Sequence, residues 1–270
     1  MAKIYAVSDI HGCYKAFRQV LRLIDLSVSK ENQLYLLGDY VDGGKDSYRI
    51  LKQIMKLEQK YPEQIKVLWG NHDEAFMNWL EQKDNDLFGY LSSGGVSTIK
   101  SFFRDNPEEY NIIVKNADGK SKRAMVQDLI AAIKSVGNKT GLIKWLHKKD
   151  AASRFIETDN QIFVHAGIAE YPDGLWKYAT ADEEFTNMYP PKTGSFYKDI
   201  IAGHVWSTEV SKDLSYAGKV YWDGESHFFI DGNVLATKNI PVLEYDTETK
   251  KYFSFEKNTE TDSLIKYEIK

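Results

Sequence analysis

Three stretches near the start of the chain share one pattern, in which an apolar run is followed by small and then metal-ligating side chains. Residues 3–12 read KIYAVSDIHG, residues 33–44 read QLYLLGDYVDGG and residues 65–73 read IKVLWGNHD. Short apolar runs bounded by glycine or serine are typical of buried strands. The segments between them carry helically spaced apolar residues: Phe17, Val20, Leu21 and Ile24, then Ile50, Leu51, Ile54 and Leu57. This order of strand and helix predicts parallel pairing through right-handed crossovers.

The rest of the chain extends this pattern. Residues 161–167 (QIFVHAG) and 200–204 (IIAGH) are two further apolar runs that end in histidine. Residues 81–152 are rich in polar side chains and predict a helical insertion, with helices at 124–134 and 141–149. The last seventy residues predict antiparallel strands at 219–222, 227–230, 242–245 and 252–255, joined by turns such as Asp223-Gly224 and Asp231-Gly232.

These elements predict an α/β fold, a two-sheet β-sandwich flanked by helices, with the parallel strands in the first sheet. We expect a single domain over residues 1–270, because 270 residues suit one large α/β unit. The insertion at about 81–152 belongs to that domain in this interpretation.

Composition excludes several function classes. A net charge of −4 argues against general nucleic-acid binding, which needs a clustered positive field. The single cysteine, Cys13, excludes an internal disulfide and favours a reducing compartment. No apolar stretch reaches membrane length, so we expect a cytoplasmic protein with no membrane partner.

Polar side chains follow each predicted parallel strand. The carboxyl ends of parallel strands share one edge of a sheet, where ligands bind. We therefore expect one cluster built from Asp9, His11, Asp39, Asp42, Asn71 and His72, together with His165 and His204.

The chemistry of these donors predicts a metal site. Carboxylate, amide and imidazole groups without thiolate suit Mn²⁺, Fe, Zn²⁺ or Mg²⁺, and Mn²⁺ is the ion we expect. The donors are too many for one catalytic ion and fit two divalent ions about 3.5–4 Å apart, bridged by a shared carboxylate. A histidine that binds no metal would protonate the leaving group, and a carboxylate would orient it. Spacing alone does not say which histidine this is.

The motifs Asp9-Ile10-His11-Gly12, Gly38-Asp39-Tyr40-Val41-Asp42 and Gly70-Asn71-His72-Asp73 resemble the signature blocks of the metallophosphoesterase superfamily. They look most like its phosphoprotein phosphatase branch, which includes bacterial serine/threonine phosphatases and symmetrical diadenosine tetraphosphatase. His165-Ala166-Gly167-Ile168 and Gly203-His204-Val205 resemble that branch's two downstream histidine blocks. Residues 93–98 and 229–232 resemble minor blocks.

The resemblance implies a role for each of these residues. Asp9 and His11 would bind the first ion, and Asp39 would bridge both. The second ion would take Asn71, His165 and His204. His72 would be the proton donor, oriented by Asp42, and a hydroxide bridging the two metals would attack the phosphate ester.

The chain departs from this branch where the branch binds phosphate. The second block normally continues with an arginine, and Gly43 stands there. The chain has no arginine after Arg154, and Tyr189 is expected at the slot of a second family arginine. We predict that Lys45, Arg49 or a residue of the insertion substitutes, or that the substrate is not the usual phosphomonoester.

The resulting hypothesis is hydrolysis of a phosphoprotein or a small phosphomonoester, as in serine/threonine phosphatases. The alternative is a dinucleoside polyphosphate hydrolase or a phosphodiesterase. A non-catalytic metal-binding scaffold ranks last, since a scaffold needs no proton donor. Trp206, two residues after His204, is predicted to pack in the core or at the rim, with stacking on a substrate ring as the alternative.

Overall fold

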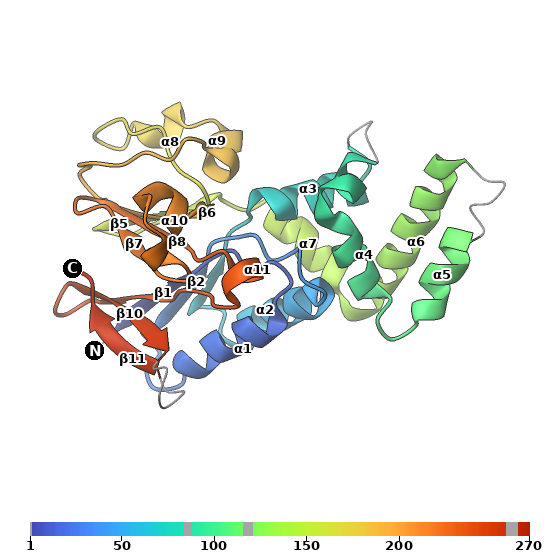
Figure 1. Cartoon of the computed structure of the whole chain (residues 1–270), viewed down its shortest axis with the longest axis horizontal. Coiled ribbons are helices and arrows are strands. Elements are labelled where there is room, and N and C mark those ends of the chain that lie inside the picture. Colours follow the sequence, from blue (N-terminus) through green and yellow to red (C-terminus); the bar gives the residue numbers. More distant parts are fainter. Residues whose placement is uncertain (1, 84–87, 116–120, 258–263) are drawn as a thin grey trace.

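The computed structural model describes residues 2–83, 88–115, 121–257 and 264–270. Two β-sheets pack face to face, and helices cover the outer face of each (Figure 1). The strand order is β11-β10-β9-β1-β2-β3 in one sheet and β4-β5-β6-β8-β7 in the other. The predicted two-sheet α/β sandwich is confirmed.

The first sheet contains the strands of all three leading stretches. Its strands β1 (Lys3–Val7), β2 (Gln33–Leu36) and β3 (Ile65–Val67) are parallel, as predicted. Antiparallel strands β9 (Leu243–Asp246), β10 (Lys251–Lys257) and β11 (Leu264–Glu268) extend it. Side chains alternate along β1: Tyr5 and Val7 face the helices, whereas Ile4 and Ala6 lie between the sheets.

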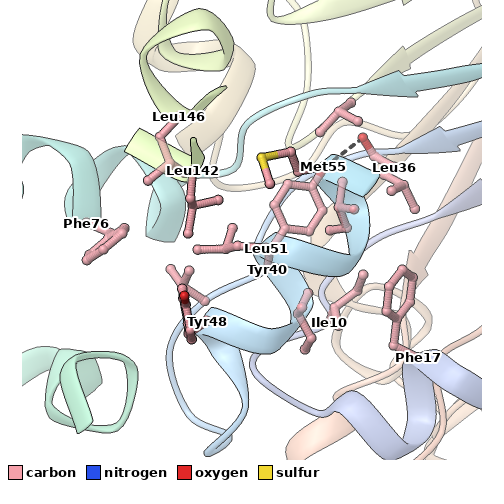
Figure 2. Packing of buried hydrophobic residues seen from close by; sticks show 14 of the residues in the cluster. Ile10, Phe17, Leu36, Tyr40, Tyr48, Leu51, Met55, Phe76, Leu142 and Leu146 are labelled. Carbon is pink, nitrogen blue, oxygen red and sulfur yellow. Dashed lines mark hydrogen bonds between the residues drawn. The ribbon is translucent and has the colours of Figure 1, made fainter. Parts of the chain in front are cut away.

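Helices α1 (Tyr14–Leu23), α2 (Ser47–Lys60) and α3 (Asn71–Leu80) pack on the outer face of this sheet. Figure 2 shows Phe17, Leu51 and Met55 from these helices around the buried ring of Tyr40. The Tyr40 hydroxyl lies 2.9 Å from the Leu36 carbonyl and 2.7 Å from that of Leu68. Because Tyr40 follows Asp39 in the chain, its burial anchors the loop that carries the second signature stretch.

The second sheet corrects one prediction. Its strands are β4 (Phe155–Glu157), β5 (Gln161–Val164), β6 (Asp199–Trp206), β7 (Tyr221–Trp222) and β8 (His227–Asp231). Strand β8 pairs antiparallel with β7, as predicted, but it also pairs parallel with β6, which the sequence did not predict. Parallel strands also occur in both sheets, not only in the first. Alternating burial reports which face is covered but not the direction of a strand, so the pattern could not show this.

The two predicted turns of this region differ in outcome. Asp223-Gly224 does join β7 to β8 as a hairpin. Asp231-Gly232 instead leads into the short helix α11 (Val234–Thr237), after which the chain enters β9 of the other sheet.

The described residues between 81 and 152 are helical, as predicted. They form η1 (Leu91–Gly95), α4 (Val96–Phe102), α5 (Pro107–Lys115), α6 (Lys122–Thr140) and α7 (Leu142–Asp150). Buried side chains of α4, α6 and α7 belong to the same apolar cluster as α1 and α2. The outer face of the second sheet packs on α8 (Trp176–Ala179) and α9 (Asp182–Asn187), and β6 continues into α10 (Ser207–Ser211) and η2 (Leu214–Tyr216). Over the described ranges, every helix is too short or too polar to span a bilayer.

His227 makes stability depend on pH. Its Nδ1 lies 2.9 Å from the Gly194 carbonyl and its Nε2 lies 3.3 Å from Glu170 Oε1. Burial alone would lower the pKa of His227, but Glu170 and Asp223 outweigh it and raise the pKa above the usual 6.5. This stabilisation is complete below pH 6.5 and is lost as pH rises through the folded-state pKa. We expect the free energy of unfolding, measured by urea denaturation, to fall over this pH range for the wild type but not for His227→Gln. Parallel dependence of the two free energies on pH would contradict the assigned role of His227.

Candidate metal centre

The sheet edges bring the predicted donors together. Asp9 and His11 follow β1, Asp39 follows β2, and His165 follows β5. Asn71 is the first residue of α3, and His204 lies within β6, between the register positions of Ala202 and Trp206 where pairing with β8 shifts. The register shift is what turns His204 out of the regular ladder.

The backbone at these donors has an uncommon conformation. Positive φ angles occur at Asp9 (54°), His11 (42°), Asp39 (57°), Asp42 (67°) and His204 (64°). Non-glycine residues rarely adopt this left-handed region, and such strain concentrates at functional sites. Five of the eleven described non-glycine residues with positive φ are thus predicted site residues.

One donor group surrounds His11. Its Nδ1 donates to the Val41 carbonyl at 3.1 Å, which leaves Nε2 directed into the site. Nε2 lies 3.8 Å from Asp9 Oδ1 and 3.6 Å from Asp39 Oδ2. A hydrogen bond on one ring nitrogen is the usual way to orient a metal-ligating histidine.

A second donor group surrounds Asn71. Its Oδ1 lies 3.1 Å from His165 Nε2 and 3.1 Å from His204 Nδ1. The His165 Nδ1 donates to the Leu37 carbonyl at 2.9 Å, so Nε2 faces the site here too. Asp39 Oδ2 lies 3.5 Å from that Nε2. Asp39 therefore lies between the two groups.

The donor set fits divalent ions. Two sets of side chains, His11/Asp39/His72 and Asp9/Asp39/His165, each bring ligand atoms within 4.8 Å of one another, and both include Asp39. Asp9 is 2% exposed, yet its Oδ1 has no hydrogen-bond partner. A buried carboxylate oxygen without a donor is costly unless a cation pairs with it. Only oxygen and imidazole nitrogen are offered, as such ions prefer.

The electrostatics favour positive charge at this position. Burial raises the pKa of Asp9 to about 6. Burial would also raise the pKa of Asp39, but His165 and the neighbouring histidines hold it below its usual range. Burial alone would lower the pKa of His165, but Asp39 raises it to about 10. Burial and the neighbouring His165 lower the pKa of His204 to about 4, which leaves His204 a neutral ligand at neutral pH.

His72 and Asp42 form a histidine–carboxylate pair beside the donors. His72 Nδ1 lies 2.9 Å from Asp42 Oδ2, and its ring stands edge-on to that of His11 at 4.9 Å. Burial would lower the pKa of His72, but the hydrogen bond to Asp42 and nearby Asp39 raise it to about 9. The side chain is one-third exposed, so a protonated imidazole faces the open cleft at neutral pH.

The sequence reasoning missed the side chains that hold Asp42. Its Oδ1 accepts hydrogen bonds from the Tyr90 hydroxyl and from Thr98 Oγ1, both at 2.7 Å. Thr98 Oγ1 in turn accepts from the Asp42 amide at 2.8 Å. A Cβ added at Gly95 would collide with the Tyr90 ring, so the glycine lets the ring pack there. The signal was the 93–98 stretch, noted only as a minor block.

Asp73 was also missed. Its carboxylate accepts from the backbone amides of Asp39 (2.7 Å), Tyr40 (3.0 Å) and Gly70 (3.1 Å). These bonds tie the loop after β2 to the start of α3. Asp73 therefore positions Asp39 without facing the cleft, and its signal was its place directly after His72.

Replacing Thr98 by valine is expected to lower the free energy of unfolding by about 1–3 kcal/mol, because it leaves the buried Asp42 amide and carboxylate short of partners. Urea denaturation measures this. Thr98→Ser keeps the hydroxyl, so its free energy of unfolding should fall much less. Ser97→Ala, on the neighbouring residue, is the control. Equal stability of the valine and serine variants would contradict the assigned role.

Lys45 and Arg49 do not reach the donors. Both are exposed and line another pocket together with Arg18, Arg22 and Arg104. The Arg49 guanidinium stacks on the Tyr14 ring at 3.8 Å. The predicted phosphate-binding role of Lys45 and Arg49 has no support in this placement.

Tyr189 and Trp206 do reach the site. Both line a cleft of about 520 Å³ that also exposes His11, Asp39, Asn71, His72 and His204. Trp206 is 47% exposed, which favours the stacking alternative over core packing.

Comparisons with known proteins agree with this geometry. A family model described as calcineurin-like phosphoesterase matches residues 2–205. The symmetrical bis(5'-nucleosyl)-tetraphosphatase of Legionella pneumophila (strain Philadelphia 1) is 41% identical over 198 residues, 73% of this chain and 55% of that protein. The protein of that name from Chromobacterium violaceum is 40% identical over 109 residues, 38% of each chain. The chain thus spans about half, or less, of the length of these curated relatives.

Solved structures show the same fold. A cold-active protein tyrosine phosphatase superposes with a TM-score of 0.57 at 15% identity, covering 98% of this chain and 78% of that one. The cold-active protein-tyrosine phosphatase of a psychrophilic Shewanella species gives 0.55 at 14% identity, with 98% and 80% covered.

Proposed function

Because the chain belongs to the calcineurin-like phosphoesterase family, we propose that it is a metal-dependent hydrolase of phosphoester bonds. The observation that carries this proposal is the convergence of two donor groups on Asp39, next to the His72–Asp42 pair. A binding scaffold would need the donors but not the pair.

In this proposal two divalent ions are held by the clustered side chains. Asp9 and His11 would hold one ion, Asn71, His165 and His204 would hold the other, and Asp39 would contribute to both. We expect Mn²⁺ from the mixture of oxygen and imidazole donors. When bound, such ions supply an activated water and neutralise charge on the phosphoryl group.

The chain's own residues supply the remaining steps. His72 is protonated and lines the cleft, and its Nε2, which the Asp42 hydrogen bond leaves free of that contact, would donate a proton to the leaving oxygen. Asp42 keeps that imidazole oriented and charged, and Tyr90 and Thr98 keep Asp42 in place. His11 and His165 are held by backbone carbonyls, which fixes their ring orientation before substrate arrives.

The substrate we propose is a phosphomonoester, as for a serine/threonine-phosphatase-like enzyme. The second candidate is a dinucleoside polyphosphate, because relatives 40–41% identical carry the name of a tetraphosphatase. We also propose one domain over residues 1–270 with a helical insertion, supported by the shared apolar cluster. The single Cys13 supports a cytoplasmic location.

Product analysis tests the function and separates the candidates. The protein is loaded with Mn²⁺ and incubated separately with p-nitrophenyl phosphate, bis-p-nitrophenyl phosphate and diadenosine tetraphosphate. Release of inorganic phosphate from the monoester is the expected result. Nucleotide products from the tetraphosphate alone would select the second candidate, and no turnover of any of the three would contradict the proposal.

A further inference from the structure

The cleft beside the donors has an unusual lining for a site that acts on phosphate. Among the residues that line it in the described part of the chain, none is lysine or arginine. Two carboxylates lie there in addition to the proposed metal and proton-donor residues, Glu209 and Asp231. Beyond any bound ions and the protonated His72, the cleft lining therefore offers no lysine or arginine to a chain of further phosphates.

Large apolar side chains form one wall instead. Tyr189 is 68% exposed, Trp206 47% and Leu235 41%, and all three line the cleft. By contrast, Trp69, Trp79, Trp145 and Trp176 are at most 7% exposed. An exposed tryptophan beside a proposed catalytic centre is not explained by core packing. We call this group the aromatic wall, after the rings of Tyr189 and Trp206; Leu235 is its aliphatic member.

The aromatic wall is attached directly to the donor framework. Trp206 ends β6, two residues after His204, and leads into α10. The Tyr189 hydroxyl lies 2.9 Å from Glu209 Oε1, and Glu209 belongs to α10. Trp206 thus directly precedes α10, and Tyr189 is joined to the same short helix by this hydrogen bond.

Leu235 completes the wall over Gly43. A Cβ added at Gly43, whose φ is +79°, would lie 2.5 Å from Leu235 Cδ1. The apolar side chain therefore occupies the space into which any side chain at position 43 would extend. At that point the cleft therefore presents the carbon atoms of Leu235.

We propose that the aromatic wall binds a planar aromatic group in the organic part of the phosphate ester, an aryl ring or a nucleobase. This inference rests on the proposed hydrolase function and narrows its substrate class. Rings stack on tryptophan and tyrosine without needing charge, which matches a cleft lined by rings and carboxylates. The reacting phosphate faces the donors while the ring lies against Trp206.

Matched ester pairs test this. Adenosine 5'-monophosphate and ribose 5-phosphate are both esters of the primary 5-hydroxyl of ribose, and only the first carries a base. Benzyl phosphate and cyclohexylmethyl phosphate differ in whether their ring is planar. We expect the wild type to prefer the planar member of at least one pair, and the pair concerned identifies a base or an aryl ring. Trp206→Ala should lower kcat/KM for that member about tenfold, mainly through KM, and change its partner by less than about twofold.

Controls separate recognition from damage to the fold. Trp206→Phe should recover most of the preference, and Tyr178→Ala removes a ring that is 89% exposed outside the cleft. No preference within either pair, or equal loss on both members in Trp206→Ala, would overturn the inference.

Binding without turnover distinguishes this inference from the proposed function. Calorimetry should show that the wild type binds phenylphosphonate more tightly than methylphosphonate. The Trp206→Ala variant should bind the two phosphonates with equal affinity. If that difference appears while no ester is hydrolysed, the aromatic wall stands and the hydrolase proposal fails. If esters are hydrolysed but the two phosphonates bind equally to the wild type, the hydrolase proposal stands and the aromatic-wall inference fails.

Discussion

Asp39→Asn is expected to reduce Mn²⁺-dependent ester hydrolysis by about a thousandfold, because the shared ligand contributes several kcal/mol of charge stabilisation. Asp39 is 2% exposed and belongs to both donor groups. Asparagine keeps its size and can still accept the hydrogen bond that His72 N donates to Oδ1 at 3.0 Å. The substitution therefore removes a charge with little change in packing. Initial rates and metal content per chain are the measurements.

A matched control is Asp25→Asn, which changes an exposed aspartate whose side chain accepts hydrogen bonds from Ser27. Its rate and metal content should equal those of the wild type. An Asp39→Asn enzyme within tenfold of wild-type activity, with full metal content, would show that Asp39 is not the shared ligand.

His72→Asn is expected to lower kcat by about 10²–10⁴-fold on esters of poorly acidic alcohols, the usual contribution of a positioned general acid. On p-nitrophenyl phosphate the loss should be smaller, because p-nitrophenolate leaves with little need of a proton. Metal content should not change, since the Nδ1 of His72 is engaged by Asp42 and the ring faces the cleft. Rates on serine phosphate and p-nitrophenyl phosphate, with metal analysis, measure this.

His147→Asn serves as control, because His147 is half-exposed, pairs with Glu81 at 3.4 Å and is not among the residues that line the cleft. Equal losses on both esters together with lost metal would instead make His72 a ligand. The grouping of His72 with His11 and Asp39 by distance makes this comparison necessary.

That the predicted donor residues lie together could be anticipated from the sequence, because the information is local. Each donor follows a short apolar run, and parallel strands bring those ends to one edge. His204 was found in the same way, although β6 continues past it after the register shift. The signature blocks then assigned roles that spacing could not.

The remaining features depend on contacts between distant segments. Tyr90 and Thr98 lie 48 and 56 residues from Asp42, within an insertion whose packing no local pattern reports. Lys45 and Arg49 follow the Asp42 loop in sequence, but Lys45, just before α2, and Arg49, within α2, both line another pocket. The parallel pairing of β8 with β6 was missed for a similar reason, since the burial pattern of β8 is the same in either direction.

Metal dependence of turnover tests the central claim most directly. A chelator first removes metal from the protein, which is then titrated with Mn²⁺. The initial rate of p-nitrophenyl phosphate hydrolysis and the amount of bound Mn²⁺ are measured at each step. The two donor groups around Asp39 predict no activity without metal and a rate that levels off at two ions per chain. A rate that levels off at one ion, or fully loaded chain that is inert, would contradict the two-metal account.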